Sequence, residues 1–359
     1  MALLAMGSRR LLVADGGKRV FELPGWADRL WPAIARLSDS ASLIRTLAEG
    51  LRVGEEEAES TAFELLRCWS QNGLAHLEAD RLWPSAKTIA LRLADCDVTL
   101  RIDDMEIAAL VRPLFAHVAC HAARLGTVID AQRHGDFTLV THHGGKALLV
   151  RTAEVAPTIK GLILEAMLAD RRLPLAFHAG CIARNGRAIL LVGSSGAGKT
   201  LFSLAAARHG FGYCADDVVL VDERAHVRGV PFAPAIKASG WALAGAIEGF
   251  ARLDTHCRLD GVPVRYPPPP RFIDEALPIG ATVLLDRRAD GPARLDRIDP
   301  VEAFVALLAE ASAPDTRIST DHCRTMADAI AAAPAYRLYY RDLDAAMTAL
   351  DEGLHVHAA

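Results

Sequence analysis

The sequence predicts a mixed α/β, or α+β, protein made of two parts, and three observations support this prediction. Helical patterns dominate residues 1 to 80, where they follow two short strand patterns. From residue 88 onward, strand patterns and helical patterns follow one another to the end of the chain. At residues 188–192 an apolar strand runs directly into a glycine-rich loop, and a helical run follows that loop.

Length and composition are those of a globular protein with more than one domain. The chain has 359 residues, of which 51% are hydrophobic, enough to fill two or three ordinary cores. Its 40 Lys and Arg residues against 44 Asp and Glu residues provide no polycationic surface for nucleic acid or for an anionic membrane. We find no membrane span and no targeting signal. We therefore expect neither nucleic acid nor a membrane among the partners.

The cysteines indicate a reducing compartment. There are seven, with no C-x-x-C pair, so neither a disulfide framework nor a zinc ribbon is expected. His117, Cys120 and His121 have a spacing that would place three metal ligands on one helix face, but no second cluster of matching spacing is present. His142-His143 is most simply a solvated turn. We expect a cytoplasmic protein without a zinc site.

Residues 1–80 are expected to form a small winged-helix-like unit. Two strands flank a turn at Asp15-Gly16-Gly17, where Asp-Gly and Gly-Gly supply the positive φ of tight hairpins. Helical patterns follow at 25–38, 41–51 and 55–74, the last with a stop at Gly73, and their tryptophans are expected in the core. The polar segment 78–87 contains a proline and marks a boundary. The expected domains are therefore 1–80 and 88–359.

Residues 88–359 are expected to form the larger α/β domain. Strand patterns are followed by helical patterns, and the turn Asn185-Gly186 joins two strands just before the glycine-rich loop. The expected strands lie at 88–103, 137–150 (a hairpin around Gly144-Gly145), 173–193, 281–288 and 335–340. The expected helices lie at 156–172, 300–311, 321–333 and from Asp342 onward.

The glycine-rich loop fits the phosphate-binding pattern G-x-x-x-x-G-K-[ST] without deviation, and it has the strand before it and the helix after it that this motif requires. Glycines allow the backbone amides to turn toward phosphate oxygens, at the positive end of the following helix. The lysine would reach the β- and γ-phosphates of ATP, and the threonine hydroxyl would bind Mg²⁺. The residues are Gly193, Ser194, Ser195, Gly196, Ala197, Gly198, Lys199 and Thr200.

The residues after the loop narrow the class of reaction. The chain has no N-K-x-D motif of a GTPase and no L-S-G-G-Q signature of a transporter ATPase, which leaves kinase-like transfer or hydrolysis. Asp216 and Asp217 come soon after the loop and stand in front of the apolar run 218–221. Two adjacent carboxylates near a dication can divide their work, one facing the metal and one facing an acceptor oxygen.

His178, the loop and "ADD" at 215–217 resemble the HPr kinase family in order and spacing. The resemblance implies a phosphoenolpyruvate-carboxykinase-like nucleotide fold that transfers phosphate from Mg-ATP to a serine hydroxyl. It implies that Asp216 is the base, that His178 orients or tunes Asp216, and that Asp217 holds Mg²⁺ together with Thr200. Relatives of this kind often assemble into rings, so a homo-oligomer is a further expectation.

The chain departs from HPr kinase/phosphorylases because it lacks their long glycine-rich signature after the aspartates. Residues 229–241, "GVPFAPAIKASGW", resemble instead the basic substrate loop of shorter, HPr-kinase-related proteins. By that resemblance Lys237 would contact the transferred phosphate, with Arg265 and Arg271 as weaker candidates for the same task.

Residues 1–80 resemble PqqD-like domains, which bind the leader segments of ribosomally made precursor peptides. The segments that carry the resemblance are 21–34, 42–51 and 55–74, in the order strand, helix, helix, helix. The mechanism this implies is strand addition, in which a leader peptide pairs with the edge of the hairpin around Val13 and Phe21. A generic winged helix stays the alternative.

Three functions remain open at this point. The first is a Mg-ATP-dependent kinase for a serine or another hydroxyl of a precursor peptide held by residues 1–80. The second is a small-molecule kinase in which residues 1–80 only pack against the larger domain. The third is a nucleotide-dependent binding or chaperone module that moves no phosphate. Peptide binding by an isolated fragment 1–80 would separate the first two.

Overall fold

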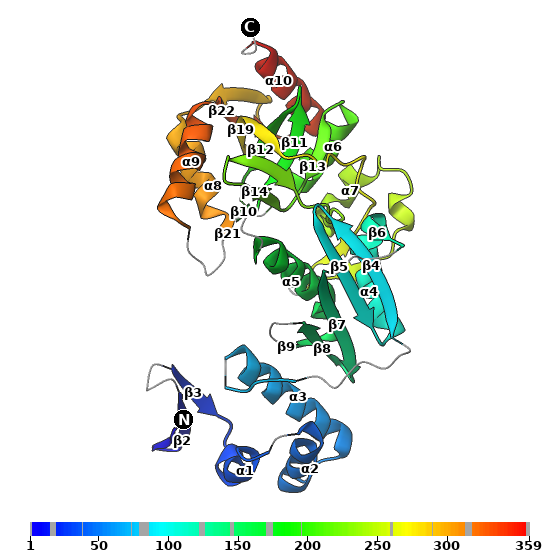
Figure 1. Ribbon diagram of the computed structural model, residues 1–359, viewed down its shortest axis with the longest axis vertical. Helices are drawn as coiled ribbons and strands as arrows, with labels where there is room; N and C mark the ends of the chain where they lie inside the picture. The colour runs from blue at the N-terminus through cyan, green and yellow to red at the C-terminus, as the bar shows by residue number, and fades with distance from the viewer. Residues whose placement is uncertain are drawn as a thin grey trace. The chain divides into compact units, whose positions relative to one another are not determined.

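The computed structural model describes the chain except residues 1, 15–18, 38, 73, 79–85, 122–125, 144–146, 170–174, 195, 259–260, 289, 313–317 and 357–359. The turns expected at Asp15-Gly17 and at Gly144-Gly145, the helix stop at Gly73 and the loop residue Ser195 lie outside the described residues. The chain forms two compact units, and Figure 1 labels many of their helices and strands. The first unit comprises 1–86, 102–107 and 129–155, and the second comprises 87–101, 108–128 and 156–359.

The first unit begins with a three-stranded antiparallel sheet in the order β1-β2-β3. Its strands are β1 (Ala2–Met6), β2 (Arg9–Ala14) and β3 (Arg19–Leu23). The sequence predicts β2 and β3 as a hairpin and does not predict β1. Because β2 is the central strand, Val13 has no free strand edge beside it, whereas Phe21 lies on the edge strand β3.

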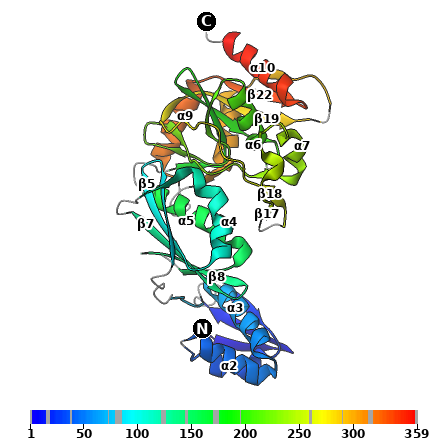
Figure 2. The ribbon, with the colours of Figure 1, turned by 90° about the vertical axis from the view of Figure 1, so that its right-hand side faces the viewer.

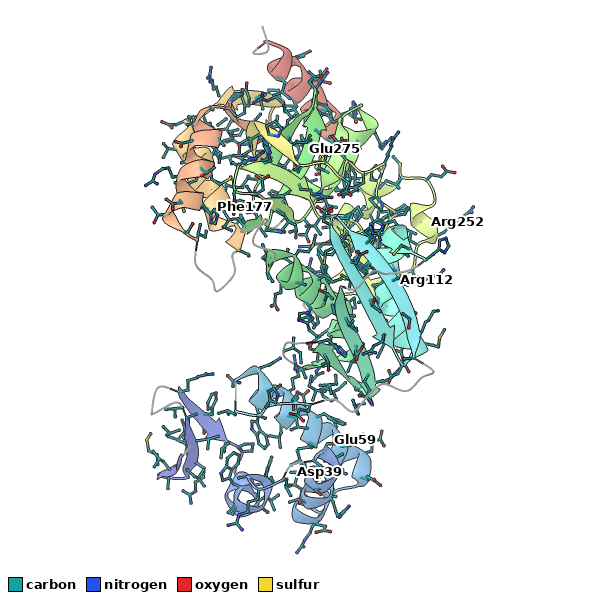
Figure 3. The ribbon with its side chains drawn as sticks, viewed as in Figure 1. Asp39, Glu59, Arg112, Phe177, Arg252 and Glu275 are labelled. Carbon is teal, nitrogen blue, oxygen red and sulfur yellow. The ribbon has the colours of Figure 1, made fainter. Side chains whose placement is uncertain are left out.

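Three helices follow in the first unit, in agreement with the sequence pattern: α1 (Ala27–Ile34), α2 (Ser40–Leu51) and α3 (Glu55–Gln71). The Asp39 carboxylate, labelled in Figure 3, caps α2 by accepting a hydrogen bond of 2.7 Å from the Ser42 backbone N–H. Apolar residues four positions apart on α2 and α3 form the core. Trp31 packs edge to face on Trp69, with ring centroids 5.6 Å apart.

The first unit also contains three antiparallel strands that pair in the order β7-β8-β9. They are β7 (Thr127–His134), β8 (Phe137–His142) and β9 (Ala147–Arg151). Helix α3 packs against them through Phe63, whose ring centroid is 5.7 Å from that of Phe137. The Arg67 guanidinium forms an ion pair of 2.9 Å with Glu154 next to this sheet.

The second unit is built on a large mixed sheet with the strand order β13-β11-β12-β19-β15-β14-β10-β21, in which β22 pairs with β19 and β20 pairs with β22. The parallel strands β12, β19 and β22 form its centre. Its strands are β10 (Leu175–Phe177), β11 (Gly180–Arg184), β12 (Arg187–Val192), β13 (Gly212–Ala215), β14 (Val219–Val221), β15 (His226–Gly229), β19 (Leu277–Arg287), β20 (Arg294–Arg297), β21 (Ala311–Ser312) and β22 (Ala335–Tyr340).

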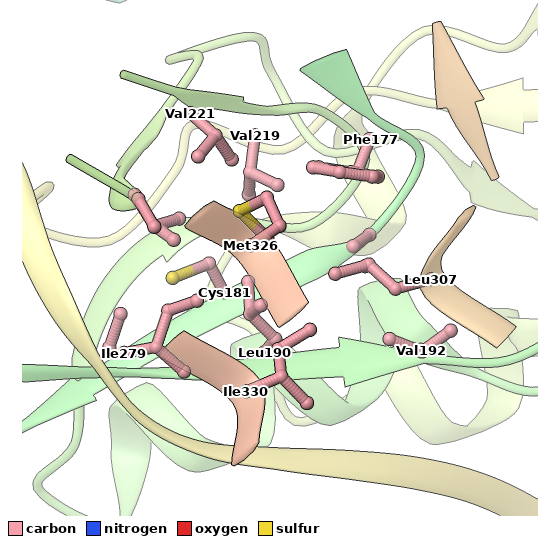
Figure 4. Packing of buried hydrophobic residues seen from close by; sticks show 14 of the residues in the cluster. Phe177, Cys181, Leu190, Val192, Val219, Val221, Ile279, Leu307, Met326 and Ile330 are labelled. Atoms are coloured by element: carbon pink, nitrogen blue, oxygen red, sulfur yellow. The ribbon is translucent and has the colours of Figure 1, made fainter. Parts of the chain in front are cut away.

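Helices cover both faces of this sheet. Side chains of α8 (Pro300–Ala309) and α9 (Thr320–Ala331) pack on one face, and those of α6 (Lys199–Arg208) and α10 (Leu343–Val356) pack on the other, an arrangement that can be followed in Figure 1. Strand β12 is therefore buried on both faces. Leu190 and Val192 face the first helix pair, in the core shown in Figure 4, whereas Ile189 and Leu191 face the second pair. This explains why residues 188–192 are uniformly apolar.

Smaller elements complete the second unit. Strands β4 (Lys87–Leu93), β5 (Cys96–Ile102) and β6 (Ala119–Cys120) pair in the order β6-β4-β5, and most residues of helices α4 (Met105–Phe115) and α5 (Val155–Ala169) also belong to this unit. A small sheet contains β16 (Ile236–Lys237), β17 (His256–Cys257) and β18 (Pro263–Arg265). Figure 2 shows α7 (Trp241–Ala244) close to α6, and an apolar cluster joins the two helices.

The prediction of a mixed α/β protein is confirmed, and the domain ranges 1–80 and 88–359 stay a prediction. The turn before β12 is as predicted, because Asn185 and Gly186 both have positive φ, +51° and +70°. Several elements were not predicted, among them α4, β7 and β13. In the described part of the chain, no helix has the length and apolar character needed to cross a membrane.

Leu190 should be among the residues on which stability depends most, since its side chain is fully buried at the centre of the sheet. We expect Leu190→Ala to lower the free energy of unfolding by about 2–5 kcal/mol. The matched control is Leu243→Ala on α7, because Leu243 is 46% exposed and its truncation should change stability by less than about 0.5 kcal/mol. Urea denaturation measures both variants, and equal losses would contradict the described core.

Candidate active site

The phosphate-binding loop connects β12 to α6 and has a conformation that requires its glycines. Gly196 and Gly198 have φ of +92° and +95°, values that residues with a side chain rarely adopt. A Cβ atom at Gly193 would lie 2.9 Å from the Cβ atom of Ala197, so the loop folds back on its own first residue. The loop therefore takes a compact turn directly in front of the N-terminus of α6.

Tyr340, the last residue of β22, is hydrogen-bonded to this loop. Its buried hydroxyl donates a hydrogen bond of 2.5 Å to the carbonyl oxygen of Ala197. Burial raises the pKa of Tyr340 to about 12, so the hydroxyl stays a donor at neutral pH. Nothing in the sequence motif indicates this contact, because 143 residues separate the two partners.

Lys199 is buried beneath the loop, with 7% of its surface exposed. Its ammonium donates a hydrogen bond of 2.6 Å to the carbonyl oxygen of Gly193. Burial lowers the pKa of Lys199, while the nearby carboxylates of Glu310 and Asp217 oppose this effect and Lys237 adds to it. Charges of both signs therefore surround the lysine, and the predicted site residue Lys237 is among them.

Asp216 and Asp217 lie in a bend between β13 and β14, opposite a second bend between β10 and β11 that carries His178. Two antiparallel pairings bring the bends together. Strand β11 pairs with β13, placing Cys181 opposite Ala215, and β10 pairs with β14, placing Phe177 opposite Val219. The sequence predicts the aspartates in front of a strand at 218–221 but does not predict β13, which ends at the residue before Asp216.

Asp216 is the buried member of the pair, with 4% of its surface exposed. Its Oδ1 accepts a hydrogen bond of 3.0 Å from the hydroxyl of Tyr213, and the Thr200 hydroxyl also donates to the carboxylate. Burial and the neighbouring charge of Asp217 raise the pKa of Asp216 to about 6, against the opposing effects of Lys160 and of these hydrogen bonds. Asp216 is thus the carboxylate on the side of the phosphate-binding loop.

Asp217 is half-buried and lies between two basic side chains. Lys160 of α5 forms an ion pair and hydrogen bond with Oδ2, and Nδ1 of His178 lies 2.9 Å from Oδ1. Burial favours the neutral acid, but the charge of Lys160 and the hydrogen bonds from His178 and Lys160 outweigh it and hold the pKa of Asp217 well below its usual range. Asp217 is therefore a carboxylate whose charge is already balanced.

The structure thus brings the predicted site residues together, but the contacts between them differ from those that the resemblance implies. The resemblance paired His178 with Asp216 and Thr200 with Asp217, whereas in the structure His178 contacts Asp217 and Thr200 contacts Asp216. The reason is the register of the strands, because the pairing of Phe177 with Val219 brings His178 next to the second aspartate.

Lys160 is a site residue that sequence reasoning missed. It lies on α5 inside the run "VAPTIKGLILEAMLA", where the only other charged residue is Glu165. Its ammonium also lies over the ring of Phe232, 4.7 Å from the centroid. The sequence did contain a signal for this role, namely a lysine in a mostly apolar helix. A buried charge of this kind needs a partner.

The loop that contains Lys237 packs against the start of α6. A Cβ atom at Gly240 would lie 3.0 Å from a methyl carbon of Leu201, and the Trp241 indole donates to the carbonyl oxygen of Ile236 over 3.0 Å. Arg265, a weaker candidate for phosphate contact, lies over the Trp241 ring and hydrogen-bonds to Thr255 and to backbone carbonyl oxygens. Its contacts are those of a structural residue. Arg271 is exposed.

His117, Cys120 and His121 do not share one helix face, the arrangement considered from the sequence, because α4 ends at Phe115. His117 lies in a short 3-10 helix and Cys120 lies in β6. Nε2 of His117 lies 2.7 Å from the carbonyl oxygen of Pro231, and burial lowers the pKa of this histidine. Among the described residues, no group of three or more His, Cys, Asp or Glu side chains could hold a metal ion. His143, expected in a solvated turn, contacts the buried Asp130 over 2.8 Å.

Comparison with known proteins adds one structural similarity. No protein-family model and no curated protein matches the chain. Among solved structures, the chain is similar to the Hpr(Ser) kinase/phosphatase from Coxiella burnetii, with 12% sequence identity and a TM-score of 0.24. The similarity covers 51% of this chain and 99% of that one.

The raised pKa of Asp216 makes a prediction about stability. Its usual pKa is 3.8 and its pKa in the folded protein is about 6, so between these values the folded state binds a proton that the unfolded state has released. Stability contributed by this residue is therefore lost as the pH rises from about 4 to about 6. Asp216→Asn removes that loss.

We expect the stability of Asp216→Asn relative to wild type to rise from pH 4 to pH 7 by up to about 3 kcal/mol. Urea denaturation at four pH values across this range provides the measurement. A stability difference that does not change with pH would contradict the environment described for Asp216.

Proposed function

We propose that the protein is an ATP-dependent kinase that transfers the γ-phosphate to a hydroxyl group. The observation that carries the proposal is the contact between the phosphate-binding loop and a second cluster of ionisable side chains, which consists of His178, Asp216 and Asp217. Lys199 and Thr200 open α6, and Thr200 reaches the bend that contains Asp216 and Asp217. A plain nucleotide-binding module needs the loop but has no need of a histidine and two carboxylates beside it.

The donor set fits Mg²⁺. Magnesium prefers oxygen ligands and is commonly bound by one or two carboxylates together with substrate phosphates and water, so a cage made only of protein ligands is not required. The Thr200 hydroxyl and the Asp216 carboxylate are adjacent oxygen donors, whereas both oxygens of Asp217 already have basic partners. Thr200 and Asp216 would therefore hold the ion, which would neutralise charge on the phosphates when bound.

Lys199 would contact the transferred phosphate after leaving the carbonyl oxygen of Gly193, and Lys237 lies close enough to influence its charge. Two lysines would then face the phosphate chain from the loop and from residues 229–241. Positioning and neutralisation of charge supply most of the rate in phosphoryl transfer, so these contacts are central to the proposed activity.

The proposed acceptor is a serine, or another hydroxyl, of a ribosomally made precursor peptide that the first 80 residues would bind. The three-stranded sheet of the first unit supports this proposal, because β1 and β3 are its edge strands. Leu4 and Met6 on β1 and Val20 on β3 are 51%, 65% and 56% exposed. An edge strand with exposed apolar side chains suits recognition by strand addition.

Mass spectrometry tests the proposed activity. The purified protein is incubated with Mg-ATP and a candidate precursor peptide, which this proposal expects to be encoded beside its gene, and we expect a gain of about 80 Da for each phosphate added. Lys199→Met should abolish the gain, whereas Lys87→Met, a matched change of an exposed lysine on β4, should leave it intact. Binding of ATP without a gain of mass on the peptide would favour the small-molecule kinase or the chaperone.

A further inference from the structure

Three groups could accept the hydroxyl proton in the proposed kinase, and their atoms have different contacts. The groups are Asp216, Asp217 and His178. Asp216 is 4% exposed and is engaged by Tyr213 and Thr200. Both oxygens of Asp217 have basic partners, Lys160 on one and His178 on the other. The side chain of His178 is 46% exposed, and only its Nδ1 atom has a partner among the described residues.

The hydrogen bonds of His178 determine which ring nitrogen carries its proton. Nδ1 lies 2.9 Å from the carboxylate of Asp217 and 3.0 Å from the main-chain carbonyl oxygen of the same residue. A carbonyl oxygen can only accept, so Nδ1 must be the donor. In the neutral imidazole, Nε2 then carries the free lone pair.

We propose that Nε2 of His178, and not either aspartate, accepts the proton of the acceptor hydroxyl, with Asp217 and Lys160 as positioning residues. This inference rests on the proposed kinase function. A histidine oriented through Nδ1 by a buried or half-buried carboxylate is an arrangement that suits general-base chemistry. Lys160 balances the charge of Asp217 and so leaves this carboxylate the task of orienting the ring.

Atoms and electrons balance in the proposed step. The hydroxyl proton moves to Nε2 of His178 while the hydroxyl oxygen forms a bond to the γ-phosphorus of ATP. The bond between that phosphorus and the oxygen of the β-phosphate breaks, and its electron pair stays with ADP. The imidazolium then releases its proton to solvent. The products are the phosphate ester, ADP and one proton.

The test compares His178→Ala with a matched histidine in the same unit. His209 comes directly after α6, is 44% exposed and lies 3.5 Å from Asp344, so it too is an exposed histidine next to a carboxylate. With Mg-ATP and the candidate precursor peptide that the wild-type protein phosphorylates, we expect kcat to fall about 10²- to 10⁴-fold in His178→Ala and to stay unchanged in His209→Ala. The KM for ATP should change less than about 3-fold in His178→Ala, since a base is used only in the chemical step.

Free imidazole separates a base from a structural residue. We expect added imidazole to restore at least about 10-fold of the kcat lost in His178→Ala, because it can take the proton in place of the missing ring. Wild-type kcat in His178→Ala, or a loss that imidazole does not reverse, would overturn the inference while leaving the kinase proposal intact. Absence of transfer by the wild-type protein would overturn the kinase proposal, and this role of His178 with it.

Lys160 has its own test as a positioning residue. Lys160→Met should lower kcat about 10-fold, and Lys160→Arg should restore most of it because the arginine can still pair with Asp217. Unchanged kcat in Lys160→Met would remove Lys160 from the proposed arrangement.

A measurement that needs neither nucleotide nor peptide tests the tautomer directly. The ¹⁵N NMR spectrum of the free protein at pH 8 should show His178 with its proton on Nδ1 and a bare Nε2. A proton on Nε2 in the neutral ring would overturn the inference, since that nitrogen could not then serve as the base.

Discussion

The candidate site depends on one constraint, which is the meeting of two bends at the junction of four short strands. The pairing of β11 with β13 fixes one side of the junction, and the pairing of β10 with β14 fixes the other. His178, in the bend between β10 and β11, therefore contacts Asp217, in the bend between β13 and β14. Because side chains in a strand alternate between faces, a shift of one residue in either register would turn these groups away from one another.

The second organising effect is electrostatic. Two adjacent carboxylates in a buried bend cannot both keep their ordinary acidity, because each charge raises the cost of the other. In the structure the two carboxylates differ in acidity because they have different partners. Lys160 and His178 stabilise the charge on Asp217, while Asp216 is buried against Tyr213 and Thr200 and is the more easily protonated. The two aspartates therefore differ in character although they are neighbours in the chain, and this difference is what allows them to have different roles.

The sequence predicted those helices, strands and loops whose structure depends mainly on residues close together in the chain. The apolar strand, the glycine loop and the helix that begins at Lys199 result from their own residues, as do the three helices α1, α2 and α3. The contacts of Lys160, Tyr213 and Tyr340 were not predictable in this way. Tyr340 reaches the loop from a strand 143 residues away, and the partner of His178 depends on strand register, which no motif encodes. The site residues were thus identified by type, while their pairing required the structure.

The central claim is that the phosphate-binding loop and the two bends surround one phosphate chain. A crystal structure of the protein with Mg²⁺ and a non-hydrolysable ATP analogue tests this claim most directly. We predict that the Lys199 ammonium leaves the carbonyl oxygen of Gly193 to contact the β- and γ-phosphates, and that the γ-phosphate lies between the loop and the bends carrying His178 and Asp216. An analogue bound away from the loop, or a γ-phosphate pointing away from both bends, would contradict it.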